Sequence, residues 1–256
     1  MEPWRSAIAN SDQTNLWIRG YDITALMQRT TFADVVFLLH QSKLPSPEER
    51  RLVDAILIAV ADHGAGAPSC AAARLVASGN RESLSAAVAA GVLAIGDEHG
   101  GAGADCMEMI AAGMNLARSE DLSIEDSAAR TFDDFRAAQK RLPGLGHRVH
   151  RERDPRTNIL FGMARQSGLA GDGVAFMEAL EKSAGNRGKV LPINIDGALA
   201  AILYDLGFSS ALGKLLFIIG RVAGLTAEVA EEHSREKAMR IKIPIIYDGP
   251  PPRALT

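Results

Sequence analysis

Helix-type segments with recognisable start signals dominate this chain, and strand-type alternation is almost absent. Ser46, Pro47 and Glu49 supply a capping residue, a first-turn proline and a third-position glutamate. Apolar residues at helical spacing follow, and a glycine-containing stretch, GAGAP, ends them. We therefore expect a helix that begins at about residue 47. His63 continues its apolar stripe, so we expect that side chain to face inward.

Similar signals predict that most of the chain is helical. Ser123 with Asp126, and Asp154 followed by Pro155, are typical of helix N-termini. The only candidate strands are LWIRGYDI (16–23) and IPIIYD (243–248). The fold class is therefore predicted to be all-α, in one large domain or a large and a small one. Further helices are expected at about 68–78, 83–95, 101–118, 123–141, 155–168, 172–184, 196–206 and 211–239.

Composition and charge argue against several classes of protein. A net charge of −3 and scattered Lys and Arg give no basic stripe for nucleic acid. Cys70 and Cys106 lie in alanine-rich helical sequence, which favours buried thiols in a reducing cytoplasm. The N-terminus has no apolar run after a basic start, so no secretory signal is predicted. Lys214 and Arg221 interrupt the longest apolar run (211–225), which indicates a buried helix rather than a membrane span.

Three glycine-containing segments carry side chains that can transfer protons. GDEHGG (96–101) contains His99, GLGHRVHRERDPR (144–156) contains His147, and NIDG (194–197) contains Asp196. Two imidazoles and a carboxylate can move protons near neutral pH, and glycines let the backbone approach a ligand. Structural roles are the alternative: a surface position for His147, and helix capping by His99 and Asp196.

Arg221 is a further candidate because it lies within the apolar stretch FIIGRVAGL. Burying a guanidinium there is costly unless an acid or a ligand pairs with it.

These segments, with ADHGAG (61–66) before them and GRVAGLTAEVAEEHS (220–234) after them, resemble the citrate synthase superfamily. The likeness runs from RGYDI (19–23) to IYDG (246–249). GDxxGG and NIDG are most like the citryl-CoA lyase branch, which includes the C-terminal module of ATP-citrate lyase. The resemblance implies a large helical domain (1–120 and 195–256) and a small CoA-binding domain (121–194), with the active site in the cleft between them.

The resemblance also implies residue roles. Citrate synthases usually place a further arginine in an R-P-R stretch, contributed across a dimer, where this chain reads RIKIPIIYDG; Arg240 or Lys242 are the substitutes that it offers. No metal and no permanently bound cofactor are implied, and coenzyme A enters as part of substrate and product. The implied sites are catalytic His99, His147 and Asp196; His63, Arg156 and Arg221 for substrate carboxylates; and Gly144, Gly146, Arg148, Arg151 and Arg153 for coenzyme A.

The implied activity is cleavage of citryl-CoA to acetyl-CoA and oxaloacetate by a cytoplasmic homodimer or higher homo-oligomer, with no nucleic-acid or membrane partner. The apolar helix at 211–230 is the candidate contact between subunits. Three alternatives stay open: a short citrate synthase, a non-catalytic subunit with a CoA pocket, and a metal-dependent hydrolase. The hydrolase would use His147 and His150, which lack a convincing third ligand.

Overall fold

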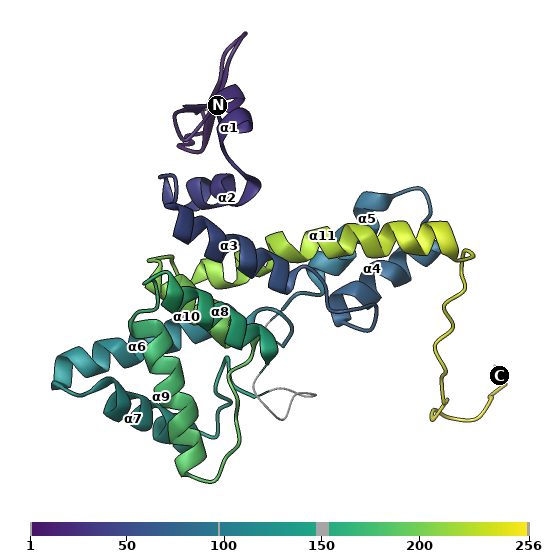
Figure 1. The fold of residues 1–256 in the computed structure, drawn as a ribbon. Helices are drawn as coiled ribbons and strands as arrows, with labels where there is room; N and C mark the ends of the chain where they lie inside the picture. The colour runs from purple at the N-terminus through teal and green to yellow at the C-terminus, as the bar shows by residue number, and fades with distance from the viewer. Residues whose placement is uncertain (1, 97, 147–153, 255–256) are drawn as a thin grey trace.

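Helices form in the described part of the chain where caps and helical spacing predict them (Figure 1). The computed structural model describes residues 2–96, 98–146 and 154–254. The Ser46 capping box opens α3, Ser123 caps α7 and Asp154 caps α8, as expected. The all-α fold class is confirmed. The helices are α1 (Ile23–Arg29), α2 (Phe32–Gln41), α3 (Pro47–Val60), α4 (Pro68–Gly79), α5 (Leu84–Leu93), α6 (Ala102–Glu120), α7 (Ile124–Ala137), α8 (Pro155–Gln166), α9 (Asp172–Asn186), α10 (Ile195–Asp205) and α11 (Ala211–Arg235).

In the N-terminal region, the candidate strand at 16–23 forms as two short strands, whereas the strand before it, α1 and α2 were not placed by the sequence reasoning. A small antiparallel sheet has the order β1-β2-β3, with β1 at Ala9–Ser11, β2 at Leu16–Ile18 and β3 at Tyr21–Asp22. Asp22 then caps α1, and Thr31 forms a capping box with Asp34 at the start of α2. The candidate strand at 243–248 does not form, because that segment is exposed and pairs with no other strand among the described residues.

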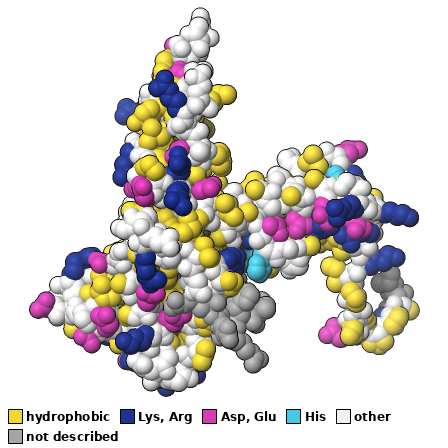
Figure 2. Space-filling model, viewed as in Figure 1, with side chains coloured by type: hydrophobic (Ala, Val, Ile, Leu, Met, Phe, Trp, Pro, Cys, Tyr) yellow, Lys and Arg dark blue, Asp and Glu magenta, His cyan; other side chains and the backbone are white. Residues whose placement is uncertain are grey.

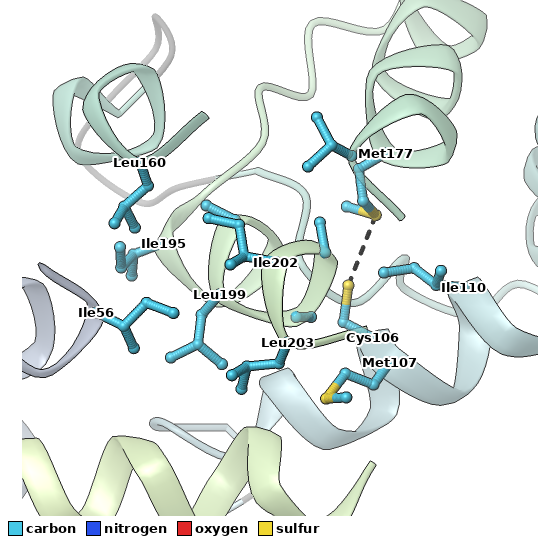
Figure 3. Packing of buried hydrophobic residues seen from close by; sticks show 14 of the residues in the cluster. Ile56, Cys106, Met107, Ile110, Leu160, Met177, Ile195, Leu199, Ile202 and Leu203 are labelled. Carbon is cyan, nitrogen blue, oxygen red and sulfur yellow. Dashed lines mark hydrogen bonds between the residues drawn. The ribbon is translucent and has the colours of Figure 1, made fainter. Parts of the chain in front are cut away.

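α10 lies at the centre of the large apolar core. Its residues from Gly197 to Leu203 are all buried, so the helix is packed on every face. Figure 3 shows Leu199, Ile202 and Leu203 surrounded by side chains from α3, α6, α8 and α9, with a contact of 3.7 Å between Cys106 Sγ and Met177 Sδ. This packing fixes the position of Asp196, the polar residue in the first turn of α10.

A second, smaller core lies between α4, α5 and α11. Four of its seven buried residues are alanines, so these helices pack closely in a thin layer. An ion-pair network borders this core: Glu232 is fully buried and accepts from Arg74 (3.1 Å) and Arg240 (2.5 Å). Arg240 also pairs with Glu236 at 3.1 Å. Arg240 is therefore engaged in structural ion pairs, and Lys242 is exposed.

The protein exposes more surface than its mass leads one to expect. The accessible surface is 15,373 Å², whereas a folded monomer of 27.3 kDa typically exposes about 11,000 Å². Figure 1 shows why: the N-terminal region, the layer containing α5, and the C-terminal segment all extend from the body. Figure 2 shows apolar atoms spread over these extensions, with acidic and basic side chains mixed along α11. None of the described helices combines the length and hydropathy needed to cross a membrane.

Candidate functional site

The C-terminal end of α3 brings together two arginines that are far apart in sequence. The carbonyl oxygen of Ala59 accepts from Arg156 Nη1 at 3.0 Å, and that of Val60 accepts from Arg221 Nε at 2.9 Å. The last carbonyls of a helix have no partner within the helix and form the negative end of its dipole. This end is therefore a natural site for guanidinium groups, and it positions both of the arginines expected to bind carboxylates.

Arg156 lies in the first turn of α8 and is held by the residue that caps that helix. Asp154 accepts from the Arg156 backbone N–H (2.9 Å), from Nε (3.1 Å) and from Nη2 (2.7 Å). Its carboxylate is 1% exposed, whereas a quarter of the Arg156 side chain remains accessible. A guanidinium has five N–H bonds, and described partners use three of these.

Arg221 is 2% exposed and contacts mainly neutral groups. Its Nη1 donates to Ser69 Oγ at 3.1 Å, and its guanidinium lies 4.9 Å from the Phe217 ring centroid, a cation–π contact. In the part of the chain that the structure describes, no carboxylate forms a salt bridge with it. The predicted burial of Arg221 is thus observed, and its charge is poised for an acidic group in a ligand.

Ser69 connects Arg221 to His99. The Ser69 hydroxyl lies 2.9 Å from His99 Nε2, and its backbone N–H donates to the same nitrogen at 3.3 Å. Ser69 is in the first turn of α4, whose N-cap residue Ala67 makes no side-chain bond. His99, 30 residues away in the sequence, therefore accepts from an N–H at the start of α4 that has no partner within the helix. Because Nε2 accepts these bonds, the neutral ring carries its proton on Nδ1.

A tight turn places His99 before α6. Gly96 and His99 exchange backbone hydrogen bonds of 3.0 and 2.9 Å. Gly100 has a φ of 75°, and a Cβ there would lie 2.3 Å from the Phe217 ring, so glycine is required. Burial lowers the pKa of His99, and the positive charge of Arg221 and then His63 lower it further. The imidazole is therefore neutral at pH 7 and can donate from Nδ1.

Asp196 lies in the first turn of α10 and does not cap that helix. Asn194 is the N-cap, and its side chain accepts from the Gly197 N–H at 3.1 Å. Burial raises the pKa of Asp196 to about 6, although Arg156 and Arg221 each lower it; the charge of Asp154 adds a smaller upward shift. The capping explanation for this aspartate is therefore excluded, and its carboxyl is suited to hold a proton.

Both described ends of the His147 segment are tied to the residues that precede α10. Gly146 N–H donates to the Pro192 carbonyl at 2.7 Å, and the Asn194 side chain donates to the Gly146 carbonyl at 2.8 Å. On the other side, Thr157 Oγ1 donates to the Ile193 carbonyl at 3.2 Å. The chain thus leaves and re-enters the described structure beside the start of α10. His147, His150, Arg148, Arg151 and Arg153 lie outside the described residues.

Gly144 makes this arrangement possible. Its φ is 78°, and a Cβ there would lie 2.6 Å from Cys106 Sγ and 2.7 Å from Gly197 Cα. Gly144 accepts a 3.0 Å bond from the Asn194 N–H. Gly146 also has a positive φ, of 81°, and its N–H already bonds to protein. The two glycines therefore fold residues 144–146 closely onto the start of α10.

The prediction that His63 faces inward is wrong. α3 ends at Val60, three residues earlier than the apolar stripe suggested, and His63 lies exposed in the following turn. Asp62 shapes this turn by accepting from the Gly64 N–H at 2.6 Å. His63 is still close enough to His99 for its charge to lower the pKa of that imidazole. The structure thus brings His63, Arg221 and His99 to one region, with Arg156 and Asp196 beside them.

One group of described residues has the types and spacing of metal ligands. Asp62, Cys70 and Glu228 offer ligand atoms within 4.8 Å of one another. Glu228 is already paired with Arg74. Burial, and the charge of Asp62, raise the pKa of the Cys70 thiol, which keeps it protonated and makes it a poor ligand.

Sequence reasoning missed Ser69, Phe217 and the contact of Asp154 with the Arg156 side chain. Asp154 was recognised only as a helix cap. Ser69 follows Pro68 at a helix start whose cap position holds alanine, and this unsatisfied start was the available signal. Phe217 lies one helical turn before Arg221, a spacing that places both side chains on one face.

A family model for the C-terminal domain of citrate synthase matches residues 45–242. Citrate synthase from Deinococcus radiodurans is 26% identical over 228 residues, which cover 86% of this chain and 57% of the relative. The chain spans about half the length of the curated relatives it matches.

Two solved structures share the fold over nearly all of this chain. Citryl-CoA lyase from Hydrogenobacter thermophilus has a TM-score of 0.91 and 39% identity, covering 100% of this chain and 98% of that one. Methanosaeta concilii ATP citrate lyase, in complex with (3S)-citryl-CoA, has a TM-score of 0.74 and 21% identity, covering 97% of this chain and 43% of that one. The second likeness concerns the fold alone.

We predict that Gly144→Ala destabilises the protein by about 2 to 4 kcal/mol, because it combines a left-handed backbone with overpacking against Cys106 and Gly197. Gly162→Ala is the matched control: it lies inside α8 with open space around its Cα, so alanine should be neutral or stabilising by up to about 1 kcal/mol. Urea unfolding measures both variants. Equal stability of the two would contradict the close packing at Gly144.

We also predict that Asp196→Asn stabilises the protein at high pH. The folded-state pKa of about 6 exceeds the reference value of 3.8 because of burial, so ionising this carboxyl costs about 3 kcal/mol of stability. The advantage of asparagine should be full at pH 8, shrink as pH falls through 6, and vanish near 3.8. Unfolding measured between pH 4.5 and 8 tests this, with exposed Asp54→Asn as control. A pH-independent difference would refute it.

Proposed function

The chain belongs to the citrate synthase family, and on that basis we propose that it cleaves citryl-CoA to acetyl-CoA and oxaloacetate. The observation that carries the choice of a lyase is the 39% identity to a citryl-CoA lyase over nearly the full length of both chains. The geometry fits acid–base chemistry of this kind in either direction, since a neutral imidazole, a carboxyl with a raised pKa and two arginines surround one region.

In the proposed reaction, His147 takes the proton of the citryl hydroxyl group. The bond between the hydroxyl-bearing carbon and the α-carbon of the thioester then breaks, and the hydroxyl oxygen becomes the ketone of oxaloacetate. Gly146, the last described residue before His147, is hydrogen-bonded to Pro192 and Asn194 and therefore lies beside the start of α10. That placement supports a base located close to Asp196.

The electron pair of the broken bond moves to the thioester, whose oxygen gains negative charge. The neutral His99 donates a hydrogen bond from Nδ1 to this developing enolate oxygen, and Ser69 holds the ring through Nε2. Asp196 then delivers its proton to the α-carbon, which gives acetyl-CoA. Proton exchange with solvent restores His147 and Asp196, so the residues of the chain suffice for the acid–base steps.

We assign the substrate's carboxylates to Arg156 and Arg221, with His63 in support. Described partners leave two N–H bonds of Arg156 and three of Arg221, and both guanidinium groups are fixed by carbonyls of α3. Coenzyme A is assigned to the segment from Gly144 onward, with Arg148, Arg151 and Arg153 for its phosphates. The division into a large domain (1–120 and 195–256) and a small domain (121–194) is part of the same proposal.

A citrate synthase is the second candidate, because the matching curated relatives carry that name. It would use the same groups in the opposite direction and add hydrolysis of the thioester.

Incubation with citryl-CoA tests the proposal, with oxaloacetate followed through malate dehydrogenase and NADH. We expect rapid oxaloacetate release that is insensitive to EDTA and falls at least roughly 100-fold in His147→Ala and in Asp196→Asn. His40→Ala, in α2, is the control and should retain activity. Free citrate and free coenzyme A would move the assignment to citrate synthase. Thermal stabilisation by coenzyme A without turnover would indicate a binding subunit.

We further propose that the protein is a homodimer or higher homo-oligomer that pairs through the layer of α4, α5 and α11. α5 contains ten residues of which only Ser85 is a polar side chain, so it is apolar on every face. Leu84 and Leu93 are nevertheless 56% and 84% exposed, and Leu75 on α4 is about half exposed. The excess of roughly 4,000 Å² of accessible surface fits burial against a second copy.

We predict that Leu93→Glu weakens this association by placing a charge in the interface. Sedimentation at micromolar concentrations should show an oligomer for the parent protein and a smaller species for the variant. Ile159→Glu is the control, since Ile159 is 64% exposed on α8, away from the α5 layer. A monomeric parent protein would refute the proposal.

A further inference from the structure

Asp154 is a buried carboxylate to which the proposed reaction assigns no part. It is 1% exposed and accepts three hydrogen bonds from Arg156. Desolvating such a pair costs about as much as the attraction returns, so buried ion pairs are weak sources of stability. Arg156 also lies in the first turn of α8, the end of a helix where a cation is unfavourable. The pair therefore calls for an explanation other than helix stability.

The geometry of the pair determines which edge of Arg156 can meet a ligand. Asp154 occupies the edge formed by Nε and Nη2, and the Ala59 carbonyl occupies one N–H of Nη1. One N–H on each terminal nitrogen remains after these bonds. Asp154 does not use these two N–H groups, and they remain able to donate to a carboxylate.

A second anion competes for Arg156. Asp196 is close enough to Arg156 for the guanidinium to lower its pKa, more strongly than Arg221 does. The groups that act electrostatically on Asp196 within the described residues are Arg156 and Asp154 from α8 and Arg221 from α11; the Cys106 thiol of α6 is also close, because Asp196 raises its pKa. A direct ion pair with Arg156 would favour the ionised form of Asp196, which would then carry no proton to donate.

We propose that Asp154 is a positioning residue. It binds the Nε and Nη2 edge of Arg156, so that the remaining N–H groups of the terminal nitrogens are presented to a substrate carboxylate and Arg156 does not pair with Asp196. This inference rests on the proposed function. Asp154 would thereby reconcile two conflicting requirements. Arg156 must bind an anionic substrate group, and Asp196 must stay protonated although it lies close to that positive charge.

Asp154→Asn and Asp154→Ser test this inference, because both residues cap helices about as well as aspartate and so preserve the start of α8. We expect both variants to fold and to raise KM for citryl-CoA at least roughly tenfold. The pH above which kcat/KM declines should also be lower in both variants than in the parent protein. A shift by one pKa unit corresponds to about tenfold in rate at pH 7. Ser123→Ala, which removes the cap of α7, controls for a purely structural effect.

A lower melting temperature with unchanged KM and pH profile would overturn the inference. A second measurement does not depend on turnover: the pH at which Asp196→Asn gains its stability advantage reports the pKa of Asp196. In the Asp154→Asn background, this pH should fall. An unchanged value would refute the coupling. If the parent protein lacks lyase activity, the proposed function fails, and this titration still decides whether Asp154 controls the pair.

Discussion

Two backbone carbonyls at the end of α3 hold the positive charge of the site in place. They belong to consecutive residues, Ala59 and Val60, and accept from guanidinium groups that come from α8 and α11. The remaining contacts build outward from this point. Arg221 reaches His99 through Ser69, and Arg156 reaches Asp154. A change that shortened or unwound the last turn of α3 would therefore disturb both arginines at once.

The proton on Asp196 depends on a balance of opposing effects. Two arginines favour the charged form, whereas burial at the start of the enclosed helix α10 favours the neutral form. Burial wins by about two pKa units, because every face of α10 is packed against other helices. The same packing that stabilises the core thus shields a titratable group from most of the surrounding water. The cost is a carboxyl that weakens the protein whenever it ionises.

Much of the fold could be predicted from the sequence, since capping residues and helical spacing are local signals. Helices α3 to α11 lie close to the expected ranges. Long-range bonds could not be predicted in this way. His99 accepts a hydrogen bond from the start of α4, 30 residues away in the sequence, and Asn194 rather than Asp196 caps α10. The error at His63 has a similar origin, because an apolar stripe does not reveal where the helix hydrogen bonds end.

The site joins two parts of the molecule that differ in how firmly they are packed. Asp196 begins α10 inside the large core, whereas Ser69 begins α4, which packs in a thin, alanine-rich layer. Thin layers open locally at a lower free energy than enclosed helices do. Opening of α4 would release the ring of His99 while Asp196 kept its buried surroundings. Moderate heating would then displace the ring of His99 reversibly before the protein melts, while the surroundings of Asp196 stay folded.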